Sequence, residues 1–216
     1  MESLRNAWQY VQDNPDKVEQ ALWVHIRLSL TALAVAMVVF IPLGILASRS
    51  NRVGPTLVAA VGAARVVPSL AVLFLLLPVL GLGERPALVA LFLLAGPPLV
   101  INTDAGLRAV DRAVMENARG LGMNALQAFA RVQAPLALPV IVAGMRTATI
   151  EVVASATLAA FIGAGGFGTF ITSGLALRDV RLLLVGAIPV TALAFLAEAL
   201  LSALERWVSP PVARPL

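Results

Sequence analysis

Residues 111–139 read DRAVMENARGLGMNALQAFARVQAPLALP, a polar and helix-forming stretch that we call the polar island. Apolar segments flank it, residues 86–103 on one side and residues 136–162 on the other. Pro135 and Pro139 are expected to turn the chain back into the bilayer. A charged segment between two membrane spans lies in water and is available to a soluble partner, although an ordinary solvated loop is the alternative.

The polar island contains the signals that begin and end two short helices. Asp111 is placed to cap a first helix, and the backbone freedom of Gly120 and Gly122 is suited to end it. Asn124, followed three residues later by Gln127, is typical of a capping box that begins a second helix. The sequence therefore predicts two rigid helices joined by a glycine turn, nearly parallel to the membrane surface and suited to a groove on a partner.

Composition makes the whole chain a membrane protein. Of its 216 residues, 59% are hydrophobic and 13% are charged, whereas about a quarter of a soluble domain is charged. The chain has no cysteine, which excludes disulfides, thiolate catalysis and zinc–thiolate sites. The net charge of +4 is explained by arginines at the membrane edges, so nucleic acid is not an expected partner.

The hydrophobic pattern predicts an all-α membrane protein with about five transmembrane helices, because crossing a bilayer takes about 20 apolar residues. The five apolar segments are residues 28–48, 53–83, 86–103, 136–162 and 182–204. The second is longer than one crossing needs and contains Pro68, so one bent span and a span with a re-entrant turn both remain open. Gly96-Pro97-Pro98 predicts a break in the third.

An odd number of spans places the two termini on opposite sides of the membrane. Arginine is slightly more abundant on the side of the polar island, so the positive-inside rule places the island and the C-terminus in the cytoplasm. We expect an external amphipathic segment over residues 1–20, a transmembrane domain over 21–207 with its main polar loop at 109–135, and a cytoplasmic tail over 208–216.

Three ionisable residues are predicted at membrane depth, where charge is costly and usually faces the protein interior or a water-filled path. They are Arg65, Arg146 and Glu151. Glu151 would favour a cationic or zwitterionic solute if it lines a path. Arg146 is five residues from Glu151 and does not share its helix face, so Arg65 is the better partner if the role is a structural ion pair.

A glycine-rich stretch, GAGGFG at residues 163–168, follows the fourth apolar segment. A nucleotide role is not expected, because the stretch follows a membrane helix rather than a strand. Gly163, Gly165, Gly166 and Gly168 are instead candidates for a tight outer-gate turn, with a flexible loop as the alternative. The chain contains no G-x-x-x-x-G-K-[ST] motif, so ATP-driven work would need another subunit.

The remaining chemistry-bearing side chains are few. The lone histidine, His25, is expected at the outer edge of the first span as a helix-end residue, and no metal site or catalytic residue is predicted. The tryptophans and the single tyrosine lie outside the mid-membrane segments, so an aromatic cage for a quaternary ammonium is not expected within the spans.

The polar island resembles the EAA loop of binding-protein-dependent ABC importers. In that loop Glu-Ala-Ala is followed at fixed spacing by Gly and by Leu-Pro. Glu116, Ala118, Gly122 and Pro135 match in register, whereas Asn117 departs from the pattern. Val132 and Ala134 stand where the pattern has Ile and Leu, and these two departures are conservative. The resemblance implies that Glu116, Asn117, Ala118, Gly120, Gly122 and Pro135 belong to the loop that couples the chain to its ATPase.

Longer blocks resemble the permeases of osmoprotectant importers, which carry glycine betaine, choline, carnitine or proline betaine. The blocks are IPLGILASR at 41–49, VPSLAVL at 67–73, PLALPVIVAGMRTAT at 135–149 and ATLAAFIGAGGFG at 156–168. Together with the membrane-depth charges they suggest pathway residues, namely Arg65, Pro68, Ser69, Asn102, Thr103, Glu151 and Thr157. The resemblance implies a methionine-permease-like core with cytoplasmic coupling helices.

The resemblance also implies the assembly in which the chain works. Its expected partners are an ABC ATPase in two copies, a second permease copy or a related permease, an extracytoplasmic solute-binding protein and the lipid of a bacterial inner membrane. The chain itself would bind no cofactor, and ATP with Mg²⁺ would sit on the ATPase. A methionine-type amino-acid permease, a secondary transporter or channel, and a membrane-embedded enzyme are the alternatives.

Overall fold

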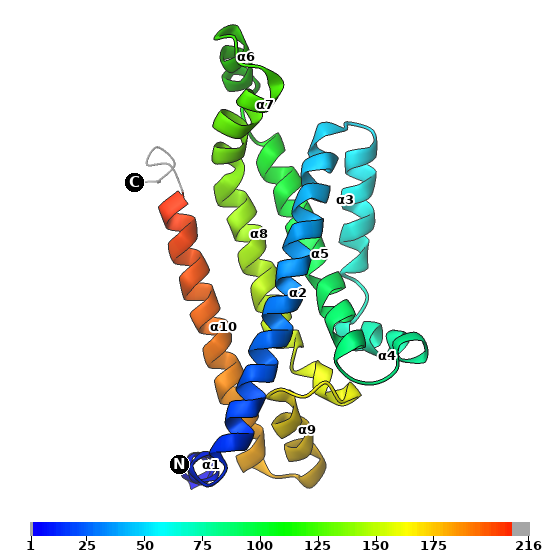
Figure 1. The fold of residues 1–216 in the computed structure, drawn as a ribbon, viewed down its shortest axis with the longest axis vertical. Helices are drawn as coiled ribbons and strands as arrows, with labels where there is room; N and C mark the ends of the chain where they lie inside the picture. Colours follow the sequence, from blue (N-terminus) through cyan, green and yellow to red (C-terminus); the bar gives the residue numbers. More distant parts are fainter. Residues whose placement is uncertain (1, 209–216) are drawn as a thin grey trace. The chain divides into compact units, whose positions relative to one another are not determined.

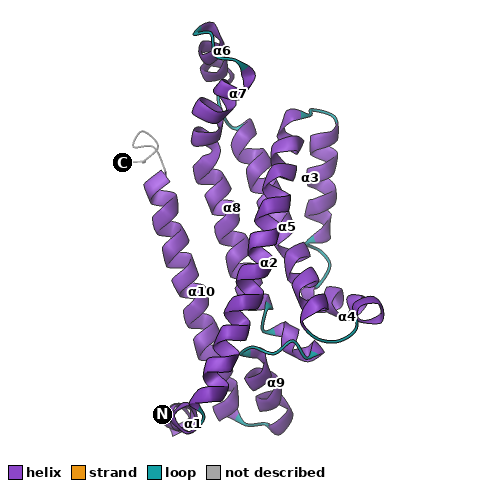
Figure 2. Cartoon of the chain, viewed as in Figure 1, coloured by secondary structure: helices purple, strands orange, loops and turns teal. Residues whose placement is uncertain are grey.

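A computed structural model of the chain describes residues 2–208, and within that range it contains helices and connecting loops only (Figures 1 and 2). In chain order the helices are α1 (Glu2–Asp13), α2 (Pro15–Arg49), α3 (Val53–Ala64), α4 (Ser69–Leu80), α5 (Glu84–Arg108), α6 (Arg112–Gly120), α7 (Ala125–Ala128), the π-helix η1 (Phe129–Gln133), α8 (Ala134–Ser155), the 3₁₀-helix η2 (Leu158–Ile162), α9 (Gly168–Leu177) and α10 (Val180–Val208). The predicted tail at 208–216 lies almost wholly outside the described residues.

Two compact units make up the chain. The first contains residues 1–35, 67–95 and 149–197, and the second contains residues 36–66, 96–148 and 198–216. The helices α2, α5, α8 and α10 contribute residues to both units.

Four helical runs within residues 2–208 are long and apolar enough to cross a membrane. They are Pro15–Arg49, Glu84–Arg108, Ala125–Ser155 and Val180–Val208. The helices α3 and α4, bent at a short break between them, count as a fifth span or as a re-entrant segment. The prediction of about five spans is confirmed, and both readings of residues 53–83 remain open.

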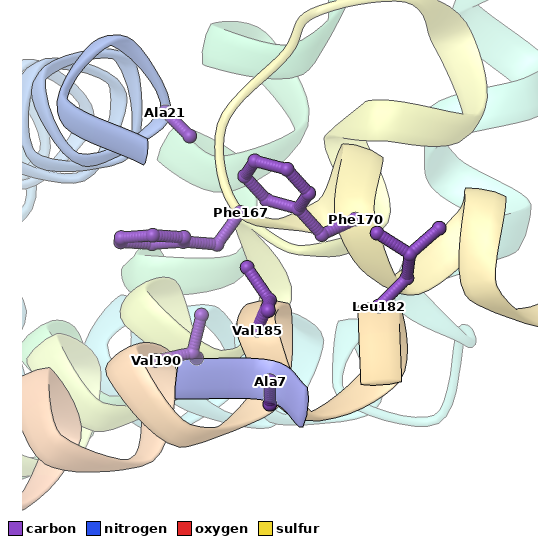
Figure 3. Packing of buried hydrophobic residues seen from close by; sticks show 7 residues of the cluster. All are labelled: Ala7, Ala21, Phe167, Phe170, Leu182, Val185 and Val190. Atoms are coloured by element: carbon purple, nitrogen blue, oxygen red, sulfur yellow. The ribbon is translucent and has the colours of Figure 1, made fainter. Parts of the chain in front are cut away.

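The first unit has its core where α1, the beginning of α2, α9 and the beginning of α10 pack together. Figure 3 shows the buried cluster, which consists of Ala7, Ala21, Phe167, Phe170, Leu182, Val185 and Val190. Tyr10 of α1 packs edge-on against Phe170, with ring centroids 6.0 Å apart. α1 therefore covers this core with its apolar face rather than lying free of the protein.

The start of α10 adds a polar contact to the same core. The Asp179 carboxylate accepts a hydrogen bond from the Arg181 backbone N–H at 2.9 Å and pairs with the Arg181 guanidinium, also at 2.9 Å. The side-chain hydrogen bond from the Arg181 guanidinium holds the pKa of Asp179 below its ordinary value. The Arg181 guanidinium in turn lies over the Tyr10 ring, 5.4 Å from its centroid, so the cap of α10 also contacts α1.

The N-terminal segment differs from its predicted form. A single amphipathic segment over residues 1–20 was expected, but α1 ends at Asp13 and α2 begins at Pro15. Proline favours the first position of a helix, because it has no N–H to leave unpaired and its φ is already helical. Residues 15–20 therefore belong to the long helix α2.

The second unit packs its helices closely on small residues. Leu107, Ala137 and Ile141 form its buried cluster, against which Ile41, Ile45 and Met145 pack. A methyl group on Gly44 would lie 2.6 Å from Cβ of Thr103, and one on Gly106 would lie 3.0 Å from the Ala137 carbonyl oxygen. Small residues at such contacts let helix backbones approach within a membrane, where van der Waals packing drives association.

Two sequence predictions about prolines are wrong. α5 runs unbroken through Gly96-Pro97-Pro98, since a proline within a helix keeps a helical φ and the buried segment is supported by its neighbours. Pro135 does not turn the chain, because the helical run continues from Ala125 to Ser155. Just before Pro135 the chain forms the π-helix η1, in which the Ala134 N–H reaches the Phe129 carbonyl.

The buried core of the first unit can be tested by replacing one of its aromatic residues. Phe167 is 1% exposed, whereas Phe195 is 71% exposed. Phe167→Ala should therefore cost about 3–5 kcal/mol of stability and lower the melting temperature of the protein in detergent. Phe195→Ala is the matched control and should melt close to wild type. Equal melting temperatures for the two variants would contradict the assigned core.

Candidate functional site

The polar island forms the two capped helices that its sequence predicts. The Asp111 side chain accepts a hydrogen bond from the Ala113 N–H at 2.8 Å and begins α6. At α7 the capping box is complete: the Gln127 N–H donates to Asn124 Oδ1 at 2.9 Å, and the Asn124 N–H donates to Gln127 Oε1 at 3.0 Å. Gly122 adopts a φ of +81° in the turn between the two helices, a conformation that favours glycine.

α6 and α7 pack on each other through alanine and direct larger side chains to solvent. Ala118 and Ala128 are buried, and Figure 1 shows the two helices together beyond the end of α5. By contrast Leu121 is 79% exposed and Leu126 is 73% exposed. Glu116 and Asn117, like the arginines on both sides of them, are also exposed. We call these exposed residues of the island, taken together, the docking face (Arg112, Glu116, Asn117, Arg119, Leu121 and Leu126).

Other details of the island differ from the predicted arrangement. α7 is continuous with η1 and α8, so only α6 is a separate short helix. Gly120 is the last residue of α6 and is exposed. Pro135 is exposed at the start of α8. Of the predicted coupling residues, only Ala118 has a buried, structural place between the helices.

Three pathway candidates lie in the second unit. Arg65 is exposed and caps the end of α3. The Asn102 side-chain amide donates to the Pro98 carbonyl at 2.8 Å, and its Cβ would lie 2.6 Å from a methyl group on Gly144. Thr103 is buried against Gly44. Asn102 and Thr103 therefore stand at helix–helix contacts, and a role along a solute path stays a prediction.

Four further pathway candidates lie in the first unit. Pro68 and Ser69 begin α4, where the Pro68 carbonyl accepts the N–H groups of Ala71 and Val72. Glu151 is half-buried in α8. The Thr157 hydroxyl donates to the Ala154 carbonyl at 2.7 Å. Arg65 belongs to the other unit, so its pairing with Glu151 also stays a prediction.

The glycine stretch at 163–168 is a tight turn with specific contacts. Gly163, Gly165 and Gly166 have φ values of +78°, +87° and +76°, which side-chain-bearing residues rarely adopt. Gly168 packs so closely that a methyl group there would lie 2.0 Å from the Thr157 carbonyl oxygen. These contacts favour the predicted turn over a flexible loop, whereas its gate function is untested.

The single histidine lies in a different place from the predicted helix end. His25 is 1% exposed within α2, and its Nε2 lies 3.0 Å from the Val153 carbonyl oxygen. Its ring packs on Phe167, with centroids 5.8 Å apart, and next to Gly166. His25 thus joins α2 to α8 and to the glycine turn, and its hydrogen-bond partner lies 128 residues away, too far along the chain to be recognised in the sequence.

Arg146 has partners that sequence reasoning missed. Its guanidinium donates to Glu205 Oε2 at 2.8 Å and to the Ser202 hydroxyl at 3.2 Å, both on α10. Glu198 Oε2 lies 3.6 Å from Arg146 Nε. The other carboxylate oxygen of Glu198, Oε1, accepts a hydrogen bond from the Ser202 hydroxyl. This cluster joins α8 to α10 in the second unit. Its signal in the sequence was the spacing of two glutamates seven residues apart on one face of α10.

Two hollows open on the first unit. One of about 280 Å³ lies beside the glycine turn, lined by Lys17, Gln20, Ala21, Val24, Gly165, Gly166, Thr169 and Phe170. Another of about 820 Å³ lies along α2, where Trp23 and the ion pair of Arg27 with Glu84 line it. Within residues 2–208, histidine, aspartate and glutamate form no group of three that could hold a metal ion.

Comparison with known proteins gives this geometry its context. Residues 40–210 match the family described as "Binding-protein-dependent transport system inner membrane component". This chain belongs to that family. It is therefore a multi-pass permease, a transport component rather than a catalytic subunit, and the resemblance drawn from its sequence is confirmed.

Relatives of this permease cover nearly its whole length. The carnitine transport permease protein OpuCB of Listeria monocytogenes is 42% identical over 95% of this chain and 94% of its own. The choline transport system permease protein OpuBB of Bacillus subtilis is 39% identical over 94% and 93%. The osmoprotectant import permease protein OsmW of Salmonella typhimurium is 32% identical over 93% and 96%.

A solved structure has the same fold as this permease. A chain of the inward-facing MetNI methionine ABC transporter superposes with a TM-score of 0.81 and 20% identity, over 90% of this chain and 97% of that one. At that identity the likeness concerns the fold alone, and it confirms the predicted methionine-permease-like core. Membership in a binding-protein-dependent ABC family implies that the permease works with an ATPase and a binding protein.

The capping box of α7 generates a test of local order in this permease. Asn124→Ala removes an acceptor worth about 1 kcal/mol, so the amides of Ala125–Ala128 should exchange with deuterium about fivefold faster than in wild type. Asn124→Asp keeps the acceptor and should exchange as wild type does. Unchanged exchange in Asn124→Ala would show that the box does not hold the helix.

Proposed function

We propose that this permease is the membrane-spanning subunit of an ATP-driven importer for osmoprotectants such as glycine betaine, choline, carnitine or proline betaine. The observation that carries the proposal is full-length similarity, at 32–42% identity, to permeases named for carnitine, choline and osmoprotectants. All these solutes bear a quaternary ammonium. Amino-acid import of the methionine type has only the likeness in fold in its favour.

The docking face is the proposed contact with the ATPase. Its exposed leucines supply apolar area and its charged neighbours supply register, the combination by which an amphipathic helix binds a groove. The capped helices are stiff enough to transmit a push, and α7 is continuous with α8, which enters the membrane. Glu116, Asn117, Gly120, Gly122 and Pro135 belong to this coupling loop. ATP with Mg²⁺ is bound and hydrolysed on the ATPase, present in two copies.

The remaining parts of the proposal concern the path and the topology. A second permease copy or a related permease completes a central path, for which Arg65, Asn102, Thr103 and Glu151 are the candidate polar residues. The glycine turn at 163–168 lies at its outer gate. The N-terminus is outside and the C-terminus is in the cytoplasm of a bacterial inner membrane. An external binding protein selects the solute.

Binding of the ATPase to the docking face is tested by replacing its exposed leucines with glutamate. Leu121→Glu with Leu126→Glu should weaken co-purification of the ATPase by about tenfold or more, because each buried leucine contributes about 2 kcal/mol. Leu4→Glu is the matched control, since Leu4 is an exposed leucine of the surface helix α1. Undiminished association of the doubly substituted permease would reject the docking role.

Substrate class is tested by uptake into proteoliposomes that hold the permease with its ATPase and binding protein. We expect accumulation of labelled glycine betaine, choline or carnitine that requires both ATP and the binding protein, and that excess methionine does not inhibit. Accumulation of methionine instead would contradict the substrate class. Accumulation driven by an ion gradient without ATP would indicate a secondary transporter.

A further inference from the structure

Three helical segments meet where the polar island joins the rest of the second unit, a place that we call the foot of the island. They are the end of α2, the end of α5 and the π-helix η1. Each pair is joined by a specific contact between side chains or between a side chain and a carbonyl. The chain enters the island directly after α5 and leaves it through η1, so both ends of the island stand on this junction.

Arg108 joins the end of α5 to the end of α2. Its Nη2 donates to the carbonyls of Ala47 and Ser50, at 2.8 and 2.9 Å, and its Nη1 donates to Asn51 Oδ1 at 3.2 Å. Its Nε donates to Asp104 at 2.8 Å, one turn earlier in α5. All three guanidinium nitrogens are therefore engaged. Two of the bonds add to the backbone N–H groups of Ser50 and Gly54, which the Ala47 and Ser50 carbonyls also accept.

Gly54 at the start of α3 leaves the space that Arg108 occupies. A methyl group on Gly54 would lie 2.5 Å from Arg108 Nη2 and 2.2 Å from the Ala47 carbonyl oxygen. The guanidinium is thus held between the last turn of α2 and the first turn of α3. The turn between these helices packs directly on an arginine that belongs to α5.

Two further contacts close the junction. The Gln133 side-chain amide of η1 donates to the Leu107 carbonyl at the end of α5, at 3.1 Å. The Arg49 guanidinium at the end of α2 lies over the Phe129 ring of η1, 5.3 Å from its centroid, a cation–π contact. Each of the three segments therefore contacts the other two.

We infer that Arg108 is a positioning residue for transport, which fixes the foot of the polar island to α2 and α3. The inference rests on the proposed function, in which the ATPase pushes on the docking face. A push on α6 and α7 moves the membrane helices only if the foot of the island is stiff. Without the Arg108 contacts, the same push turns the island about a loose base and the ATP is hydrolysed without transport.

The chemistry explains why this position needs arginine. A planar guanidinium offers five donors in a fixed fork, whereas a lysine ammonium is a point charge on a flexible stem. Arg108→Lys therefore keeps the positive charge but cannot reach Asp104, Asn51 and both carbonyls together. Gln133→Leu keeps the size of the side chain and removes the donor to the Leu107 carbonyl. Both variants leave the docking face unchanged.

The test measures uptake of labelled glycine betaine and ATP hydrolysis in the same proteoliposomes, which hold the permease with its ATPase and binding protein. For Arg108→Lys we expect the ATPase to co-purify as in wild type and hydrolysis to persist, while the ATP used per solute rises about tenfold. Gln133→Leu should raise the same ratio to a smaller extent. Arg206→Lys should match wild type, because Arg206 is exposed on α10 and its Nε donates to the Ser202 carbonyl of the same helix.

The outcomes separate the inference from the proposed function. A wild-type ratio in Arg108→Lys, or a parallel loss of uptake, hydrolysis and ATPase association, overturns the positioning role. Retained hydrolysis with lost uptake supports it. A wild-type assembly that hydrolyses ATP but carries no quaternary ammonium solute contradicts the proposed function, and does so before any variant is compared.

Discussion

The structure depends on side-chain hydrogen bonds to carbonyls at two helix ends, because the last carbonyls of a helix have few partners within the helix itself. At the end of α2 the Arg108 guanidinium donates to the Ala47 and Ser50 carbonyls, which also accept backbone N–H groups. At the end of α5 the Gln133 amide donates to the Leu107 carbonyl. The polar side chains that satisfy these carbonyls also join the three segments to one another. The polar island can therefore extend into water as a stiff element, since its foot is held from both sides.

The sequence was sufficient for features whose interactions are local. Asp111 caps α6 through a residue two positions away, and Asn124 and Gln127 form a capping box across three residues. Such signals depend on short-range geometry, so they can be recognised in the sequence without knowledge of the fold. The number of spans could also be predicted from the sequence, because it follows from the lengths of the apolar segments and the thickness of the bilayer.

Features that depend on distant partners were missed. Arg146 bonds Glu205, 59 residues away, and His25 meets the Val153 carbonyl, 128 residues away. The spacing of Glu198 and Glu205 indicates one polar face of α10, but nothing along the chain shows which distant residue that face meets. The sequence also failed to predict the π-helix η1 and the unbroken course of α5 through Gly96-Pro97-Pro98. In a membrane protein, neighbouring helices can support a backbone conformation that local sequence rules would exclude. The roles of Arg65 and Glu151 along a path remain predictions.

In the proposed function the permease hydrolyses no ATP itself, and a separate ATPase moves it through the docking face. The sharpest measurement uses the absence of native cysteine: Leu121→Cys supplies a unique thiol on that face. We predict that a membrane-impermeant maleimide labels it only in inverted vesicles, and that assembly with the ATPase protects it or cross-links it to that subunit. Labelling from the outside of right-side-out vesicles, or labelling that the ATPase leaves unchanged, would contradict the account.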